Sequence, residues 1–144
     1  MNLQWLSLCF LFLYLILAGC STSHLTADRD QAFKSYEEQN YQKACSQFEI
    51  LATKIPKDTL LWFKYGNACA KAQYPQKAIS AYQNALLRDP SLVKAWYNMG
   101  IIQMQAALNT FIEMEPFVEQ ESAIGQRGQK MKEGLLLLLE DSDS

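Results

Sequence analysis

The feature that most constrains the fold of this 144-residue chain is a pattern of residue types that recurs every 34 positions. Trp62 recurs as Trp96, and Gly66 recurs as Gly100. A period of this length predicts a stack of similar units, none of which buries its apolar face alone. The other matches at this shift are Ala44 with Ala78, Phe48 with Tyr82, and Pro56 with Pro90.

The central copy of the pattern resembles the tetratricopeptide repeat (TPR), a family of two-helix units. Small residues stand where two helices approach closely, aromatic rings surround them, and a proline ends the second helix because it cannot continue it. The resemblance implies an all-α fold, a TPR-like helical-hairpin solenoid of about three repeats with a C-terminal capping helix. The matching positions are Trp62, Tyr65, Gly66, Cys69, Ala78, Tyr82, Ala85 and Pro90, of which only Cys69 replaces the usual Tyr.

The two flanking copies keep one half of the pattern each, and the resemblance covers roughly residues 26–110. The first copy keeps its second helix but lacks the tryptophan of the first. The third copy keeps its first helix and loses the second, since Ile112, Pro116 and Glu119 stand where Ala, an aromatic residue and Ala belong. Terminal repeats are expected to be atypical because they cap the stack.

The C-terminal part of the chain predicts one long helix, which Pro116 interrupts, and then a further helix over residues 117–140. We expect the repeats to occupy residues 28–115, and a capping helix with a frayed tail to occupy residues 116–144. The expected apolar face of the capping helix covers the exposed end of the solenoid, and a docking peptide for another protein is the alternative. This face consists of Ile124, Met131, Leu135, Leu138 and Leu139.

An apolar run over residues 5–17 dominates the N-terminus. As a helix it would be roughly 20 Å long, which is short of the roughly 30 Å hydrocarbon core of a bilayer. Its length suits a secretory signal. It ends in Leu-Ala-Gly-Cys, which resembles the bacterial lipobox and implies cleavage after Gly19 and a covalent lipid on Cys20.

The lipobox resemblance predicts a lipoprotein signal peptide over residues 1–19 and a lipidated tether over residues 20–27. Ser21 stands where Asp would retain such a protein in the inner membrane, so the resemblance implies the periplasmic face of the outer membrane. Residues 1–20 contain no Lys or Arg, which departs from a usual signal and leaves an uncleaved anchor as the alternative.

Composition argues against several functional classes. The chain has 13 basic and 15 acidic residues, without a basic patch of the kind that binds nucleic acid. His24 is the single histidine, which argues against a triad or metal cluster built on several histidines. We therefore expect no enzyme, no nucleic-acid partner, no metal and no cofactor besides the lipid. An acid–base pair among Glu113, Glu115, Glu119 and Glu121 is the enzymatic alternative to a solvated helix flank.

Cys45 and Cys69 lie at apolar helix positions of the predicted domain. The predicted compartment is oxidising, so a disulfide between them is permitted. Buried free cysteine also behaves as a small hydrophobe. We favour two free cysteines, because a bridge must also meet strict distance limits; the sequence alone leaves both possibilities open.

The TPR resemblance also implies a concave groove lined by the first helix of each repeat. It would be apolar and aromatic with a basic rim, and would suit an amphipathic helix or an extended apolar peptide. We expect Phe63 and Tyr97 to be exposed, whereas Phe33 and Tyr36 either contact a ligand or pack within the protein. A carboxylate clamp is incomplete, since only Lys94 fits one. The implied groove residues are Arg29, Phe33, Tyr36, Leu60, Phe63, Lys64, Asn67, Lys94, Tyr97, Asn98 and Ile101.

These features together predict a lipid-anchored periplasmic adaptor. It would bind a protein or peptide partner in its groove and assist assembly of an envelope complex, as pilotins do. A permanent structural subunit of an envelope or secretion complex is the alternative. Confinement to a membrane surface would raise the effective concentration of the adaptor without new contacts.

Overall fold

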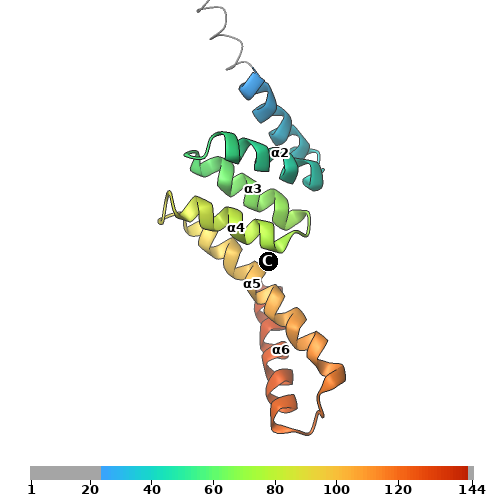
Figure 1. The fold of residues 1–144 in the computed structure, drawn as a ribbon. Coiled ribbons are helices and arrows are strands. Elements are labelled where there is room, and N and C mark those ends of the chain that lie inside the picture. Colours follow the sequence, from blue (N-terminus) through green and yellow to red (C-terminus); the bar gives the residue numbers. More distant parts are fainter. Residues whose placement is uncertain (1–23, 143–144) are drawn as a thin grey trace, which may run out of the picture.

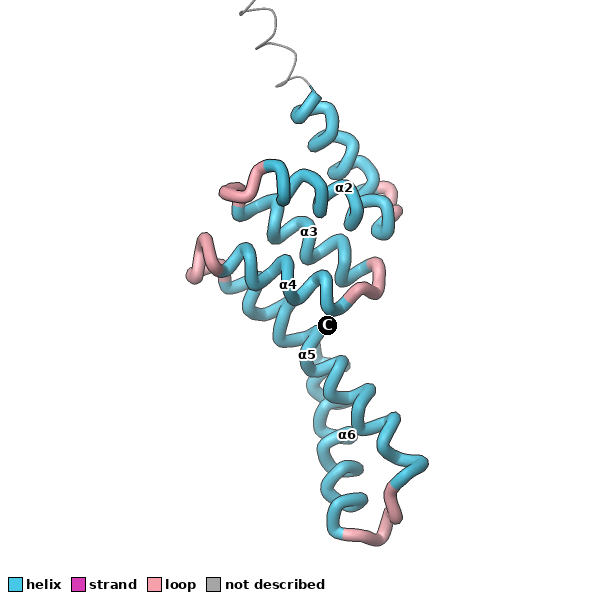
Figure 2. The backbone as a smooth tube through the Cα atoms, viewed as in Figure 1, coloured by secondary structure: helices cyan, strands magenta, loops and turns pink. Residues whose placement is uncertain are grey.

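The computed structural model describes residues 24–142, which form helices joined by short turns (Figures 1 and 2). No strand occurs in this part of the chain, and the expected all-α, TPR-like solenoid is confirmed. The elements are a helix over residues 24–37, α2 (Tyr41–Lys54), α3 (Thr59–Lys71), α4 (Pro75–Leu86), α5 (Val93–Met114), the 3-10 helix η1 (Glu115–Phe117) and α6 (Ala123–Ser142).

From α2 onward, each α-helix packs against the next one along the chain. Figure 1 shows a stack of short antiparallel helices, from whose end the longer hairpin of α5 and α6 projects. The turns repeat as the sequence does: Gln39 and Gln73 both adopt a left-handed backbone, with φ of 60° and 63°, between the two helices of a repeat. Asp58 caps α3 by accepting a hydrogen bond from the Leu61 amide at 3.1 Å.

The core of the central repeat depends on the absence of a side chain at Gly66. A Cβ atom there would lie 2.5 Å from the Tyr82 ring, so only glycine lets this ring of α4 lie on α3. Trp62 packs beside them, and its Nε1 donates a hydrogen bond to the Pro56 carbonyl at 3.0 Å. The Arg88 guanidinium covers this indole, 5.1 Å from its centroid. The predicted roles of small and aromatic residues are confirmed here.

A disulfide joins Cys45 of α2 to Cys69 of α3, so the favoured expectation of two free cysteines is wrong. The sequence shows that both positions face the core, but not how close they come. In the structure the two Cα atoms are 4.9 Å apart, within the range that a bridge requires. Cys69 therefore replaces the usual tyrosine with a covalent link between repeats.

The C-terminal hairpin differs from its prediction in three ways. First, α6 begins at Ala123 instead of residue 117, and it continues to Ser142, into the segment expected to fray. Second, α6 packs along α5, the last helix of the stack, and the two project beyond the stack as a hairpin. Third, Leu135 and Leu139 are half-buried, whereas Ile124, Met131 and Leu138 of the predicted face are exposed. The small residues Gly125 and Gly128, both buried, take their place and let the hairpin close tightly.

At the other end of the chain, residues 24–27 were assigned to the tether but are helical. The signal peptide, the lipid site Cys20 and the rest of the tether lie outside the described residues. Within residues 24–142, every helix is too short or too polar to cross a bilayer.

Replacing both Cys45 and Cys69 by alanine is expected to lower the free energy of unfolding by about 3 kcal/mol, because the bridge closes a loop of 24 residues. Urea unfolding with and without a reductant measures this. Reductant should destabilise the wild type by a similar amount and leave the double variant unchanged. If the wild type has the same free energy of unfolding with and without the reductant, the bridge is contradicted.

Candidate functional site

The concave pocket, as we call it, lies between the first helices of the three repeats and has a volume of about 340 Å³. Its lining comes from the helix over residues 24–37 and from α3, α4 and α5. The residues that line it are Tyr36, Asn67, Ala70, Lys71, Tyr82, Tyr97, Asn98, Ile101 and Ile102.

A hydrogen-bond network forms the floor of the concave pocket and joins three helices. The Oδ1 atom of Asn67 accepts from the Tyr82 hydroxyl at 2.8 Å and from Asn98 Nδ2 at 3.0 Å. Asn98 Nδ2 also lies 3.4 Å from the Tyr82 hydroxyl oxygen. Among the described residues, Asn67 Nδ2 and Asn98 Oδ1 have no hydrogen-bond partner. The floor thus offers one donor and one acceptor, the set that a peptide backbone uses.

Burial changes the acidity of the tyrosines around this floor. It raises the pKa of Tyr82 to about 12, because the ionised phenolate is poorly solvated there; the hydrogen bond from Asn98 opposes this effect. The pKa of Tyr36 is also raised, by burial first and by Tyr41 second. Both hydroxyls therefore stay protonated over the physiological range and act as neutral hydrogen-bonding groups.

The walls of the concave pocket are aromatic and aliphatic. Tyr97 is 56% exposed, and Ile101 and Ile102 are half-buried beside it. Tyr36 stands on the opposite wall, held edge-on by Tyr41 at 5.4 Å and by Phe48 at 6.5 Å. A rigid polar floor between such walls suits a short segment with apolar side chains.

The basic rim is tied to the protein's own rings and carboxylates. Lys64 Nζ lies 5.6 Å from the ring centroids of both Phe33 and Tyr36. Arg29 forms an ion pair with Asp58 at 3.1 Å. Both side chains are thus engaged by groups of the protein itself.

The structure brings five of the eleven predicted groove residues into the concave pocket and leaves six around it. Phe33 packs at 90° on Phe48, 5.2 Å between centroids. Phe63 was expected to be exposed, but it is half-buried with its ring 5.9 Å from that of Tyr82. The five in the concave pocket are Tyr36, Asn67, Tyr97, Asn98 and Ile101; the six outside are Arg29, Phe33, Leu60, Phe63, Lys64 and Lys94.

Sequence reasoning missed Tyr82, which it assigned to packing alone. Most of its ring is buried, but its hydroxyl reaches the floor of the concave pocket. The available signal was the hydroxyl itself, since a buried tyrosine needs a hydrogen-bond partner. Ala70, Lys71 and Ile102 were also missed because they flank the positions that the TPR resemblance implied.

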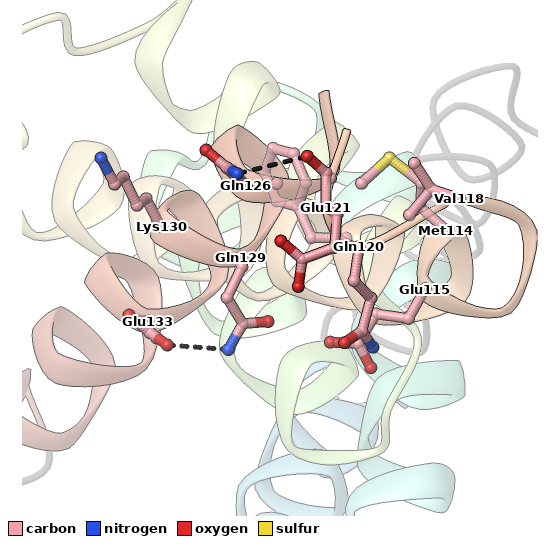
Figure 3. Close-up of a pocket in the computed structure, with 12 residues that line it drawn as sticks. Met114, Glu115, Val118, Gln120, Glu121, Gln126, Gln129, Lys130 and Glu133 are labelled. Carbon is pink, nitrogen blue, oxygen red and sulfur yellow. Dashed lines mark hydrogen bonds between the residues drawn. The ribbon is translucent and has the colours of Figure 1, made fainter. Parts of the chain in front are cut away.

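A second cavity of about 430 Å³ lies at the tip of the α5–α6 hairpin (Figure 3). Gln126 Nε2 of α6 donates to the Glu121 carbonyl of the turn at 3.2 Å, and within α6 Gln129 Nε2 donates to Glu133 Oε1 at 2.7 Å. Glu115 pairs with Lys132 of α6. Within the part of the chain that the structure describes, no group of three potential metal ligands comes together.

Comparison with known proteins finds a limited similarity to the peroxisomal targeting signal receptors of fungi. The chain is 33% identical to that of Saccharomyces cerevisiae over 69 residues, which are 48% of this chain and 11% of the receptor. The identity to the Kluyveromyces lactis receptor is also 33% over 69 residues, and to the Candida albicans receptor 30% over 66 residues. The chain spans only about 11–12% of the length of these relatives. No model of a known protein family matches the sequence.

Raising the pH from 9 to 11 is expected to destabilise the wild type by about 1 kcal/mol more than a Tyr82→Phe variant. The folded-state pKa of Tyr82 is raised to about 12, so its contribution is complete below the unfolded value of 10.0 and is lost as the pH rises toward 12. Urea unfolding of both chains at each pH measures the difference. Parallel pH profiles for the two chains would contradict the raised pKa.

Proposed function

We propose that this protein is a TPR-like adaptor that binds a segment of another protein in its concave pocket. The observation that carries the proposal is the floor of Asn67, Tyr82 and Asn98. One amide nitrogen and one amide oxygen remain available there, held rigidly between apolar walls. An extended backbone presents the complementary pair of groups, and the walls accept its side chains.

The comparisons support the same class of role. The fungal relatives are receptors for a targeting signal, which favours recognition of a segment in another protein. The similarity covers less than half of this chain, so we draw only this class of activity from it.

We propose further that the adaptor works outside the cytoplasm, held at the outer membrane by a lipid on Cys20. Two observations support this location independently. The Leu-Ala-Gly-Cys sequence follows an apolar run of signal length. The Cys45–Cys69 disulfide suits an oxidising compartment such as the periplasm. Placement at the membrane would then concentrate the groove where an envelope complex assembles, as in a pilotin.

A permanent structural subunit is the second candidate. It is favoured by the apolar surface of the α5–α6 hairpin, where Trp96, Met131 and Leu138 are each more than half exposed. A surface of this kind suits a constant neighbour more than a passing ligand.

Photocrosslinking in cells tests the adaptor. A photoreactive residue at Tyr97 should capture a discrete partner, whereas one at Gln83, an exposed position on α4, should not. The Asn67→Ala, Asn98→Ala double variant should lower the Tyr97 crosslink at least tenfold, because the backbone of the ligand loses its polar partners. An equal yield of the Tyr97 crosslink in the double variant and in the wild type would argue against the pocket. A crosslink from Gln83 as strong as the one from Tyr97 would indicate nonspecific capture.

Labelling with radioactive palmitate tests the anchor separately. The wild type should take up label and sediment with membranes, and Cys20→Ser should lose the label. The matched control is Cys9→Ser, which changes a cysteine within the predicted signal and should keep the label. A Cys20→Ser chain that stays labelled would reject the lipid site without bearing on the pocket.

A further inference from the structure

The third repeat lacks the helix that would cover its tryptophan. In the central repeat α4 packs on α3, and Trp62 is only 9% exposed. The first helix of the third repeat holds its tryptophan in the same way as α3 does. Trp96 Nε1 donates to the Pro90 carbonyl at 3.0 Å, as Trp62 Nε1 does to the Pro56 carbonyl. Yet Trp96 is 53% exposed, because α5 continues to Met114 where the counterpart of α4 would have begun.

The two equivalent glycines differ in the same way. At Gly66 an added Cβ would meet the Tyr82 ring at 2.5 Å, whereas at Gly100 it would meet no atom within 4 Å. Glycine inside a helix costs about 1 kcal/mol relative to alanine. In the described part of the chain, no atom occupies the space that a side chain at Gly100 would enter. The empty space above Gly100 corresponds to the position that the Tyr82 ring occupies above Gly66.

The surface around Gly100 is an apolar slot of about 500 Å³. We call it the α5 slot, and Leu135 of α6 forms one edge of it. Ile124, Met131 and Leu138 recur every seven residues on the flank of α6 next to Leu135, and each is more than half exposed. They form an exposed apolar stripe along α6. The residues of the α5 slot are Trp96, Tyr97, Gly100, Ile101, Gln103, Met104, Ala107 and Leu135.

We propose that the α5 slot binds an amphipathic helix of another protein, which lies on α5 as α4 lies on α3. The interface between α3 and α4 defines the chemistry of this helix. It places an aromatic ring over Gly100, with small residues four positions before and three positions after, as in Ala78, Tyr82 and Ala85. The partner thus supplies the missing second helix of the third repeat.

A second copy of this chain fits the α5 slot less well. Ala78 and Tyr82 of α4 belong to the required pattern, and Ala44 and Phe48 of α2 match its first half, but all four are buried in their own core. α6 contains no aromatic residue, so it cannot supply the ring that the α5 slot requires. The described helices therefore hold no free segment with a small-residue, aromatic, small-residue spacing.

The probe for this proposal is a labelled peptide of residues 74–89, made helical by a lactam bridge between side chains introduced at positions 76 and 80, which are exposed in α4. Fluorescence anisotropy measures its binding to the full chain in lipid nanodiscs. We expect saturable binding that weakens at least tenfold when alanine replaces the residue of the peptide that corresponds to Tyr82. The Asn67→Ala, Asn98→Ala variant should bind the peptide normally, which separates the α5 slot from the concave pocket.

The decisive variant is Gly100→Ala. It should weaken peptide binding at least tenfold, while its melting temperature stays at or above that of the wild type, because alanine favours the helix. The matched control is Gly134→Ala in α6, which also lies in open space but outside the α5 slot and should leave binding unchanged. Three results would overturn the proposal: no binding to the wild type, equal binding to Gly100→Ala, or a wild-type dimer that Gly100→Ala dissociates, since the occupant would then be a second copy.

Discussion

The close approach of α3 and α4 at Gly66 is the contact on which the rest of the structure depends. Because Gly66 has no side chain, the Tyr82 ring lies directly on α3, with only 1% of its surface exposed. A methyl group there would force the ring aside, a kind of overpacking that typically costs 1–3 kcal/mol. The same ring position sends the Tyr82 hydroxyl through to the concave side, where it meets Asn67 and Asn98. One packing contact thus builds both the core and the floor of the concave pocket.

Links between neighbouring helices strengthen a core that is small and linear. The Cys45–Cys69 bridge ties α2 to α3, and the Lys77–Glu49 ion pair, at 2.7 Å, ties α4 back to α2. The hydrogen bond from Lys77 lowers the pKa of Glu49, so this carboxylate stays charged at neutral pH although burial opposes it. In a stack where each unit contacts only its neighbours, such links act locally. They hold the first two repeats rigidly and leave the α5–α6 hairpin supported along one side.

The sequence predicted the repeats well because their spacing follows from local rules: small residues at close contacts, aromatic residues around them, and proline after the second helix. It predicted five of the residues in the concave pocket for the same reason. It did not predict the disulfide, which depends on a distance between two helices that no spacing reveals. It also misjudged Phe63 and the apolar face of α6. In both cases the choice between core and solvent depends on how a neighbouring helix packs, and in α6 the residue packed closely against α5 is Gly128, beside Met114.

The length of α5 joins the two surfaces that this protein offers. Had α5 ended after about thirteen residues, as its counterpart α3 does, a second helix could have followed and covered Trp96. Instead, Tyr97 and Ile101 line the concave pocket on one side and the α5 slot on the other. A helix seated in the slot would contact the exposed face of Tyr97 and fix its ring, and so fix one wall of the concave pocket. Any effect of one ligand on the affinity for the other must be reciprocal. Because Tyr97 and Ile101 line both cavities, a ligand in the α5 slot would act on the concave pocket through α5.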